Sequence, residues 1–209
     1  MACCDCESTG QALARSAAQR RVLWTVLFIN VAIFVGEFGA GLWADSTALQ
    51  GDSLDSLGDA LVYALSLWAV GQALRWRAGS ALVKGGIQLL FAGIVIAEVG
   101  RKLVTGAEPL TGVMAIAAGV ALIANLTCLA LLTRFRSHDI NMRSVWLCSR
   151  NDVIGNAGVL LTTALMAWSG WTWLDLAFGA LLALLFARTG VEVLRSAWPQ
   201  FRLHPSHVQ

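Results

Sequence analysis

Apolar residues run through the chain in long blocks, and polar residues interrupt those blocks at only a few points. A helix needs about 20 apolar residues to cross a bilayer. The sequence offers six segments of roughly that length. They cover residues 22–43, 48–74, 82–102, 110–133, 143–168 and 172–194. We therefore predict an all-α integral membrane protein with six transmembrane helices.

Composition agrees with that class, because 57% of the 209 residues are hydrophobic and only 13% are charged. Little sequence remains for a soluble domain. We expect a cytoplasmic, cysteine-containing tail over residues 1–21, a six-helix membrane domain over 22–198, and a short cytoplasmic tail over 199–209. Trp198 and Pro199 are expected to end the last helix.

The basic residues lie mainly in alternate loops, which predicts the orientation of the chain. If the N-terminus is inside, only Arg101 and Lys102 fall in external loops. The positive-inside rule then places both termini in the cytoplasm, with the helices in the inner (cell) membrane. Topology accounts for the basic residues, so we expect the bilayer and not a nucleic acid as a partner. The internal segments hold Arg15, Arg20, Arg21, Arg75, Arg77, Lys84, Arg134, Arg136, Arg143, Arg195 and Arg202.

Three carboxylates interrupt the second predicted helix, within residues 51–62. Asp55 and Asp59 are four residues apart, so they share one helix face, and Asp52 joins that face. A carboxylate near the middle of a bilayer costs roughly 3 kcal/mol, so three of them need a partner. A divalent cation is the natural partner. The alternative is a polar helix face solvated by a cavity, with no specific ion.

The fifth predicted helix repeats this spacing with Cys148 and Asp152. In a six-span topology the second and fifth helices are antiparallel, which puts Asp55 level with Asp152 and Asp59 level with Cys148. Two residues from each helix can then form one tetrahedral site of three oxygens and one sulfur. Asp52 is a possible accessory ligand. The alternative for Cys148 is a small hydrophobe packed against a neighbouring helix.

Three cysteines also cluster near the N-terminus, at Cys3, Cys4 and Cys6. Clustered thiols with neighbouring carboxylates can capture a soft ion such as Zn²⁺ or Cd²⁺ in the reducing cytoplasm. The alternative is an unstructured tail that carries cysteines by chance. His204 and His207 near the other terminus are interpreted as unstructured sequence.

The remaining polar residues of the spans have simpler interpretations. We expect a structural or proton-linked role for Glu37 and not direct ligation. Asp45 is expected to be solvated, and Glu98 and Arg101 to pair at i, i+3. Cys128 is interpreted as a small buried hydrophobe.

Taken in order, these pieces resemble the cation diffusion facilitator family, the six-span metal/proton antiporters, over roughly residues 30–198. In that family the second span carries His or Asp followed four residues later by Asp, which matches Asp55 and Asp59. The fifth span carries the same pair, which matches Cys148 and Asp152, with cysteine as a departure. The resemblance rests on Phe34–Phe38, Ser46–Leu49, the aspartates at 52, 55 and 59, Glu98 before Pro109, Asp139–Arg143 and Asp152–Val159.

The resemblance implies proton-coupled efflux of divalent transition metals, with Zn²⁺ or Cd²⁺ as the expected substrate and no cofactor. Cys148 puts the usual preference for Zn²⁺ in question, because a thiolate is a softer ligand than imidazole. Members commonly carry a cytoplasmic C-terminal domain that binds metal and helps dimerisation. Residues 199–209 hold no such domain, so we expect a short member of the family and a homodimer that forms without it.

Two other functions compete with efflux. An integral-membrane lipid phosphoalcohol transferase also uses metal-bound aspartates, but it expects Asp-Gly near the first pair, whereas Asp55 precedes Ser56. A mercury-type uptake carrier is suggested by Cys3 and Cys4, yet it does not explain the paired aspartates. We therefore predict a secondary transporter and not an enzyme.

Overall fold

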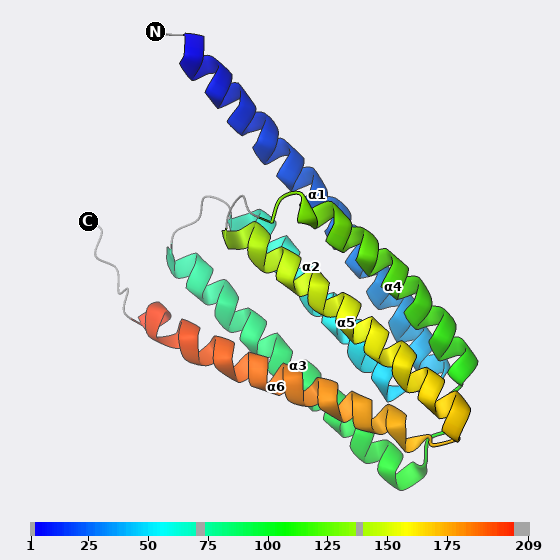
Figure 1. Cartoon of the computed structure of the whole chain (residues 1–209). Coiled ribbons are helices and arrows are strands. Elements are labelled where there is room, and N and C mark those ends of the chain that lie inside the picture. The colour runs from blue at the N-terminus through cyan, green and yellow to red at the C-terminus, as the bar shows by residue number, and fades with distance from the viewer. Residues whose placement is uncertain (1–2, 70–73, 137–139, 203–209) are drawn as a thin grey trace.

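The computed structural model describes residues 3–69, 74–136 and 140–202, and these residues form six α-helices. The described part of the chain contains no strand. Figure 1 shows the helices side by side, with the first half of α1 projecting beyond the others. The helices are α1 (Cys3–Trp43), α2 (Thr47–Ala69), α3 (Leu74–Thr105), α4 (Thr111–Thr133), α5 (Ile140–Ser169) and α6 (Trp173–Arg202).

The predicted all-α class is confirmed. Among the described residues, three helices are long and apolar enough to cross a membrane, and the count of six spans stays a prediction. The three are Ala17–Trp43 of α1, Thr111–Thr133, and Trp173–Arg195 of α6. Three helices extend well past the predicted segments. α1 begins at Cys3 and not at residue 22, α3 begins at Leu74 and not at residue 82, and α6 continues through Pro199 to Arg202. Helical hydrogen bonds do not require apolar side chains, so a helix can extend past its apolar block. Proline near a helix end removes only one of those bonds.

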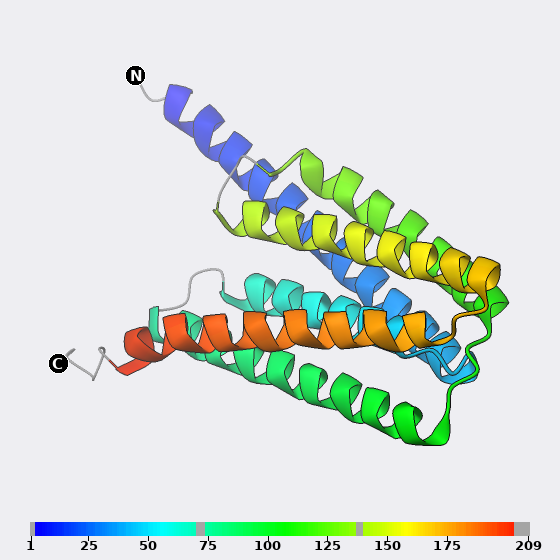
Figure 2. The same cartoon turned by 60° about the horizontal axis from the view of Figure 1, so that its bottom comes forward.

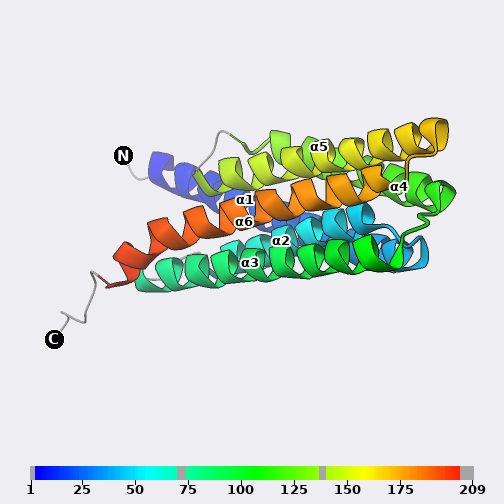
Figure 3. The ribbon, with the colours of Figure 1, turned by 90° about the horizontal axis from the view of Figure 1, so that it is seen from below.

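The helices run along one common direction, and α3 and α6 form a pair of their own (Figures 2 and 3). Two glycines allow the close approach of that pair. A Cβ added at Gly85 would lie 3.1 Å from the carbonyl oxygen of Gly190, and one added at Gly190 would lie 3.0 Å from that of Gly85. α1 packs chiefly on α2, and α4 on α5.

Polar residues lie inside the bundle and large apolar residues lie on its surface. Asn30, Glu37 and Asn125 are each at most 2% exposed, whereas Ile116 is 72% exposed and Trp168 is 87% exposed. A soluble protein shows the opposite distribution. This arrangement suits helices whose outer surface contacts lipid.

The loops at residues 44–46, 106–110 and 170–172 meet at one end of the bundle, which we call the loop end (Figure 1). There Asp175, the buried acidic residue in the first turn of α6, caps the N-terminus of α2. Its carboxylate accepts hydrogen bonds from the Ser46 hydroxyl at 2.6 Å and from the amides of Thr47 at 2.6 Å and Ala48 at 3.1 Å. This contact fixes the start of the helix that carries Asp55 and Asp59.

A second contact at the loop end joins α3 to the turn between α1 and α2. The buried Lys102 ammonium lies 2.7 Å from the Asp45 carbonyl oxygen and 3.0 Å from its carboxylate. The expectation that Asp45 is merely solvated is therefore wrong, because its partner is distant in the sequence. The predicted pair of Glu98 and Arg101 is confirmed, with a shortest distance of 2.7 Å.

We expect Asp175→Ala to lower the free energy of unfolding by about 2 kcal/mol, the upper range for loss of an N-cap, because buried donors lose their acceptor. Thermal unfolding in detergent, with Glu108→Ala as the control, measures the effect. Glu108 is an exposed acid in a loop of the same end. Equal melting temperatures for the two variants would show that the cap does not hold α2.

Candidate metal-transport site

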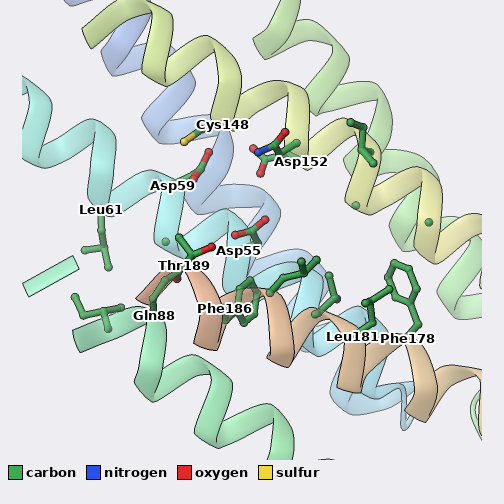
Figure 4. A pocket seen from close by; sticks show the side chains of 18 of the residues that line it. Asp55, Asp59, Leu61, Gln88, Cys148, Asp152, Phe178, Leu181, Phe186 and Thr189 are labelled. Carbon is green, nitrogen blue, oxygen red and sulfur yellow. The ribbon is translucent and has the colours of Figure 1, made fainter. Parts of the chain in front are cut away.

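A cavity of about 600 Å³ opens between α2, α3, α5 and α6. All four predicted ligands line it: Asp55, Asp59, Cys148 and Asp152. Figure 4 shows their side chains converging from two facing helices, with Cys148 beside Asp59. The helices α2 and α5 run antiparallel, as the sequence predicts (Figure 1), and the pairing of their ligands at one level stays a prediction. The remaining polar lining comes from Gln88, Asn151 and Thr189, and apolar residues and glycines of the same four helices cover the rest.

The two helices deliver these side chains because residues four apart point the same way from a helix. Asp59 and Asp152 are buried, at 7% and 3% exposed, while Asp55 and Cys148 are partly exposed. Asp59 and Asp152 therefore bring two buried carboxyl groups to the same cavity. Two such groups disfavour joint ionisation unless a cation lies between them.

The cavity is acidic, since none of the described residues that line it is Lys, Arg or His. Arg150, although next to Asn151 in sequence, lies on the surface, with its guanidinium 5.8 Å from the centre of the Trp146 ring. Positive charge for the carboxylates must therefore come from a cation or from protons. Carboxylate and thiolate together suit a divalent transition metal.

The four predicted ligands are not arranged around one common ion position. Within residues 3–69, 74–136 and 140–202, no group of three His, Cys, Asp or Glu side chains lies close enough to hold a metal ion. Binding a metal through all four predicted ligands requires rotamer changes that draw them together. The ligand set accordingly remains a prediction, with a cavity that contains all its members.

A family model described as the cation efflux transmembrane domain matches residues 23–200. The chain belongs to the cation efflux family. The resemblance found in the sequence is thereby confirmed. The matched model describes a transmembrane domain, so the prediction of a membrane location is confirmed as well.

Curated relatives in the cation efflux family carry names of metal transporters. The zinc transporter ttm-1 of Caenorhabditis elegans is 25% identical over 84% of this chain and 50% of its own. The metal cation efflux system protein CzcD of Cupriavidus metallidurans is 24% identical over 78% and 56%. The zinc transporter ZitB of Escherichia coli is 27% identical over 86% and 59%. The chain spans about half the length of the relatives it matches.

Asp52, the possible accessory ligand in this cation efflux domain, does not line the cavity. It is 2% exposed and faces Gly155 of α5, where an added Cβ would lie 2.6 Å from its Oδ1. It also lies near Glu37 of α1, with which it interacts electrostatically. These two acids therefore sit behind the cavity, inside the bundle, and Glu37 does not line it either.

The sequence of this cation efflux chain also carries cysteines and histidines near its termini and a further cysteine in α4. Cys3, Cys4 and Cys6 fall in the first two turns of α1, but their side chains lie outside the described part of the structure. His204 and His207 lie outside the described residues altogether. Cys128 is fully buried, which confirms its interpretation as a small hydrophobe.

Tyr63 contacts the predicted ligand Asp59 of this family member but was not predicted from the sequence. Tyr63 donates a hydrogen bond from its hydroxyl to Asp59 Oδ2, at 3.0 Å. The signal was present in the sequence, because Tyr63 follows Asp59 by four residues and continues the stripe that starts at Asp55. Gln88 and Thr189 were also missed, since nothing local marks them as neighbours of the aspartates.

Proposed function

We propose that this protein exports divalent transition-metal ions in exchange for protons. The observation that carries the proposal is the acidic cavity, which gathers Asp55, Asp59, Cys148 and Asp152 from α2 and α5 with no basic residue in its described lining. The names of the relatives support metal transport by this family. One is named a cadmium, cobalt and zinc/H⁺–K⁺ antiporter, which supports proton coupling.

The proposed substrate follows from the donor set. Three carboxylates and one thiolate can supply a tetrahedral site for Zn²⁺, and the sulfur also favours the softer Cd²⁺. An all-oxygen site would favour harder ions such as Mg²⁺ or Mn²⁺. We therefore infer Zn²⁺ or Cd²⁺ as the transported ion, bound as substrate and not as a resident cofactor.

Proton exchange follows from the same side chains. A metal binds the deprotonated forms of carboxylate and thiol, so its entry releases protons and the return of protons releases the metal. The buried carboxyl groups of Asp59 and Asp152, which line one cavity, are the proposed place for such protons in the metal-free state. Rocking of α3 and α6 against the other helices would expose the cavity to each side in turn.

The proposed orientation has all six helices crossing the inner membrane, with both termini in the cytoplasm. Arg20, Arg21, Arg134 and Arg136 lie toward the end where α1 begins and α6 ends. At the loop end, α3 carries Arg101 and Lys102, and each of them forms ion pairs with acidic side chains. The positive-inside rule then makes the loop end external. Residues 1–21 and 199–209 are the proposed cytoplasmic tails around a domain of residues 22–198, and the proposed partners are protons, lipid and a second copy of the chain.

Purified protein in liposomes tests this function. With acid outside and equal concentrations of Zn²⁺ or Cd²⁺ on both sides, the metal should leave the liposome, and so build up a gradient, while protons enter. Inverted molecules should give the same exchange when the acid is inside, with both directions reversed. A metal-sensitive dye and a pH-sensitive dye on opposite sides follow both movements. Metal flux that is independent of the pH gradient would contradict the exchange mechanism, and no flux of any divalent metal would contradict transport.

The cysteines of the N-terminal tail are proposed to aid capture without being essential. Deleting residues 1–7 should raise the metal concentration needed for half-maximal transport severalfold and leave the maximal rate unchanged. Replacing Cys3, Cys4 and Cys6 by Ser at full length is the matched comparison, and should give the same result. If either variant fails at every metal concentration, the tail belongs to the transport site itself.

A further inference from the structure

Tyr63 of α2 stands directly behind Asp59. Its hydroxyl donates to Asp59 Oδ2 at 3.0 Å, and its ring is 0% exposed. It does not line the cavity, so it is not placed to touch an ion held there. One of the two carboxylate oxygens of Asp59 is therefore held from outside the cavity.

The ring of Tyr63 is fixed by a large apolar cluster. Its members come from α1, α4 and α5 as well as from the turn after α4. Such packing leaves the ring little rotational freedom, so the direction of the hydroxyl is fixed as well. The buried members are Leu23, Val26, Leu27, Cys128, Leu132, Phe135, Met142 and Val145.

A tyrosine hydroxyl in such surroundings needs an explanation. Phenylalanine would fill the same space, and a buried hydroxyl is costly unless it makes a hydrogen bond. Here the bond goes to a carboxylate that lines the cavity, and bonds to charged acceptors are the stronger kind. Carboxylates that bind metals are commonly oriented by such outer partners.

We propose that Tyr63 is a positioning residue of the transport site, which holds Asp59 Oδ2 so that Oδ1 is presented to the metal. The proposal rests on the function proposed above. It makes Asp59 a one-oxygen ligand, which suits a four-coordinate ion with one donor from each side chain. Because residues of α1, α4 and α5 pack around Tyr63, the position of Asp59 would also depend on that packing.

Tyr63→Phe tests this role with almost no change in volume. We expect the variant to bind Zn²⁺ about 10- to 100-fold more weakly, the usual effect of losing an outer partner of a metal ligand. The half-saturating concentration for transport should rise by a similar factor, while the maximal rate changes little. Thr163→Val is the matched control, because it removes another buried hydroxyl, which bonds the Val159 carbonyl at 2.8 Å and does not line the cavity.

The unmodified chain offers a second test, because Tyr63 is its single tyrosine. Tyrosine labelled with ¹³C at Cζ gives one NMR signal, whose shift reports the state of the hydroxyl bond. Titration with Zn²⁺ should move this signal with the same midpoint as metal binding measured by calorimetry. The readout needs no substitution, so a folding defect cannot imitate it.

The outcomes separate the two proposals. Zinc binding with an unmoved Tyr63 signal, and with equal affinity in Tyr63→Phe, overturns the positioning role and leaves the transport function standing. Absence of zinc binding and transport in the unmodified protein overturns the function, and the positioning role with it. Weaker binding in Tyr63→Phe but not in Thr163→Val, together with a shifted signal, supports the proposal.

Discussion

Asp59→Ala and Asp152→Ala should each reduce Zn²⁺ transport to the rate of protein-free liposomes. Each carboxylate is buried, lines the cavity and belongs to the second residue of a pair spaced four residues apart. Loss of an outer partner of a metal ligand costs up to about 100-fold in affinity, and loss of the ligand itself should cost at least that. Initial rates in proteoliposomes, at matched protein content, give the measurement.

Two controls make the aspartate result specific. Glu108→Ala removes an exposed acid far from the cavity and should transport normally. Asp59→Asn and Asp152→Asn keep the shape of the side chain and should fail like the alanine variants, since an amide cannot exchange a proton for a metal. Normal transport by either alanine variant would remove that residue from the site.

Cys148→Ala should lower transport of both Zn²⁺ and Cd²⁺, and Cd²⁺ more strongly. Thiolate is the softest donor in the cavity, so its loss affects the softer ion most. Cys148→His restores the ligand that the family more often uses, and should keep Zn²⁺ transport while losing part of the relative preference for Cd²⁺. Both ions should be measured in the same proteoliposome preparation.

Cys128→Ala is the matched control for the cysteine variants. It removes the other thiol of the described helical core, which is fully buried and does not line the cavity, so both ions should move at near-normal rates. If Cys148→Ala behaves in the same way, Cys148 only packs against its neighbours. The three carboxylates of the cavity would then hold the ion, since Asp52 lies behind the cavity.

Much of the fold could be predicted from the sequence because the apolar blocks have the length of a membrane span. All six helices appear, and the loops around Asp45 and Pro109 were placed correctly. The helix ends were less accurate. The basic residues after Leu74 suggested a loop, but a helix can continue into water once its apolar part is anchored.

The residues of the candidate site also fall into those that the sequence predicts and those that it does not. Asp55, Asp59, Cys148 and Asp152 could be found because spacing within one helix fixes the face on which a residue lies. Asp175 could not be found, since its partners at the start of α2 are far away in sequence. The spacing rule that revealed the aspartates also places Tyr63 beside Asp59, but spacing alone does not show that the tyrosine hydroxyl bonds to that neighbour.

X-ray absorption of bound metal tests the central claim most directly. The chain has five cysteines, so replacing Cys3, Cys4 and Cys6 by Ser and Cys128 by Ala leaves Cys148 as the only thiol. Bound Zn²⁺ should then show one sulfur neighbour at about 2.3 Å and oxygen neighbours at about 2.0 to 2.2 Å. The sulfur should vanish on further replacement of Cys148 by Ala. A first shell of oxygen alone in the single-cysteine protein, at full zinc occupancy and with transport intact, would contradict the proposed site.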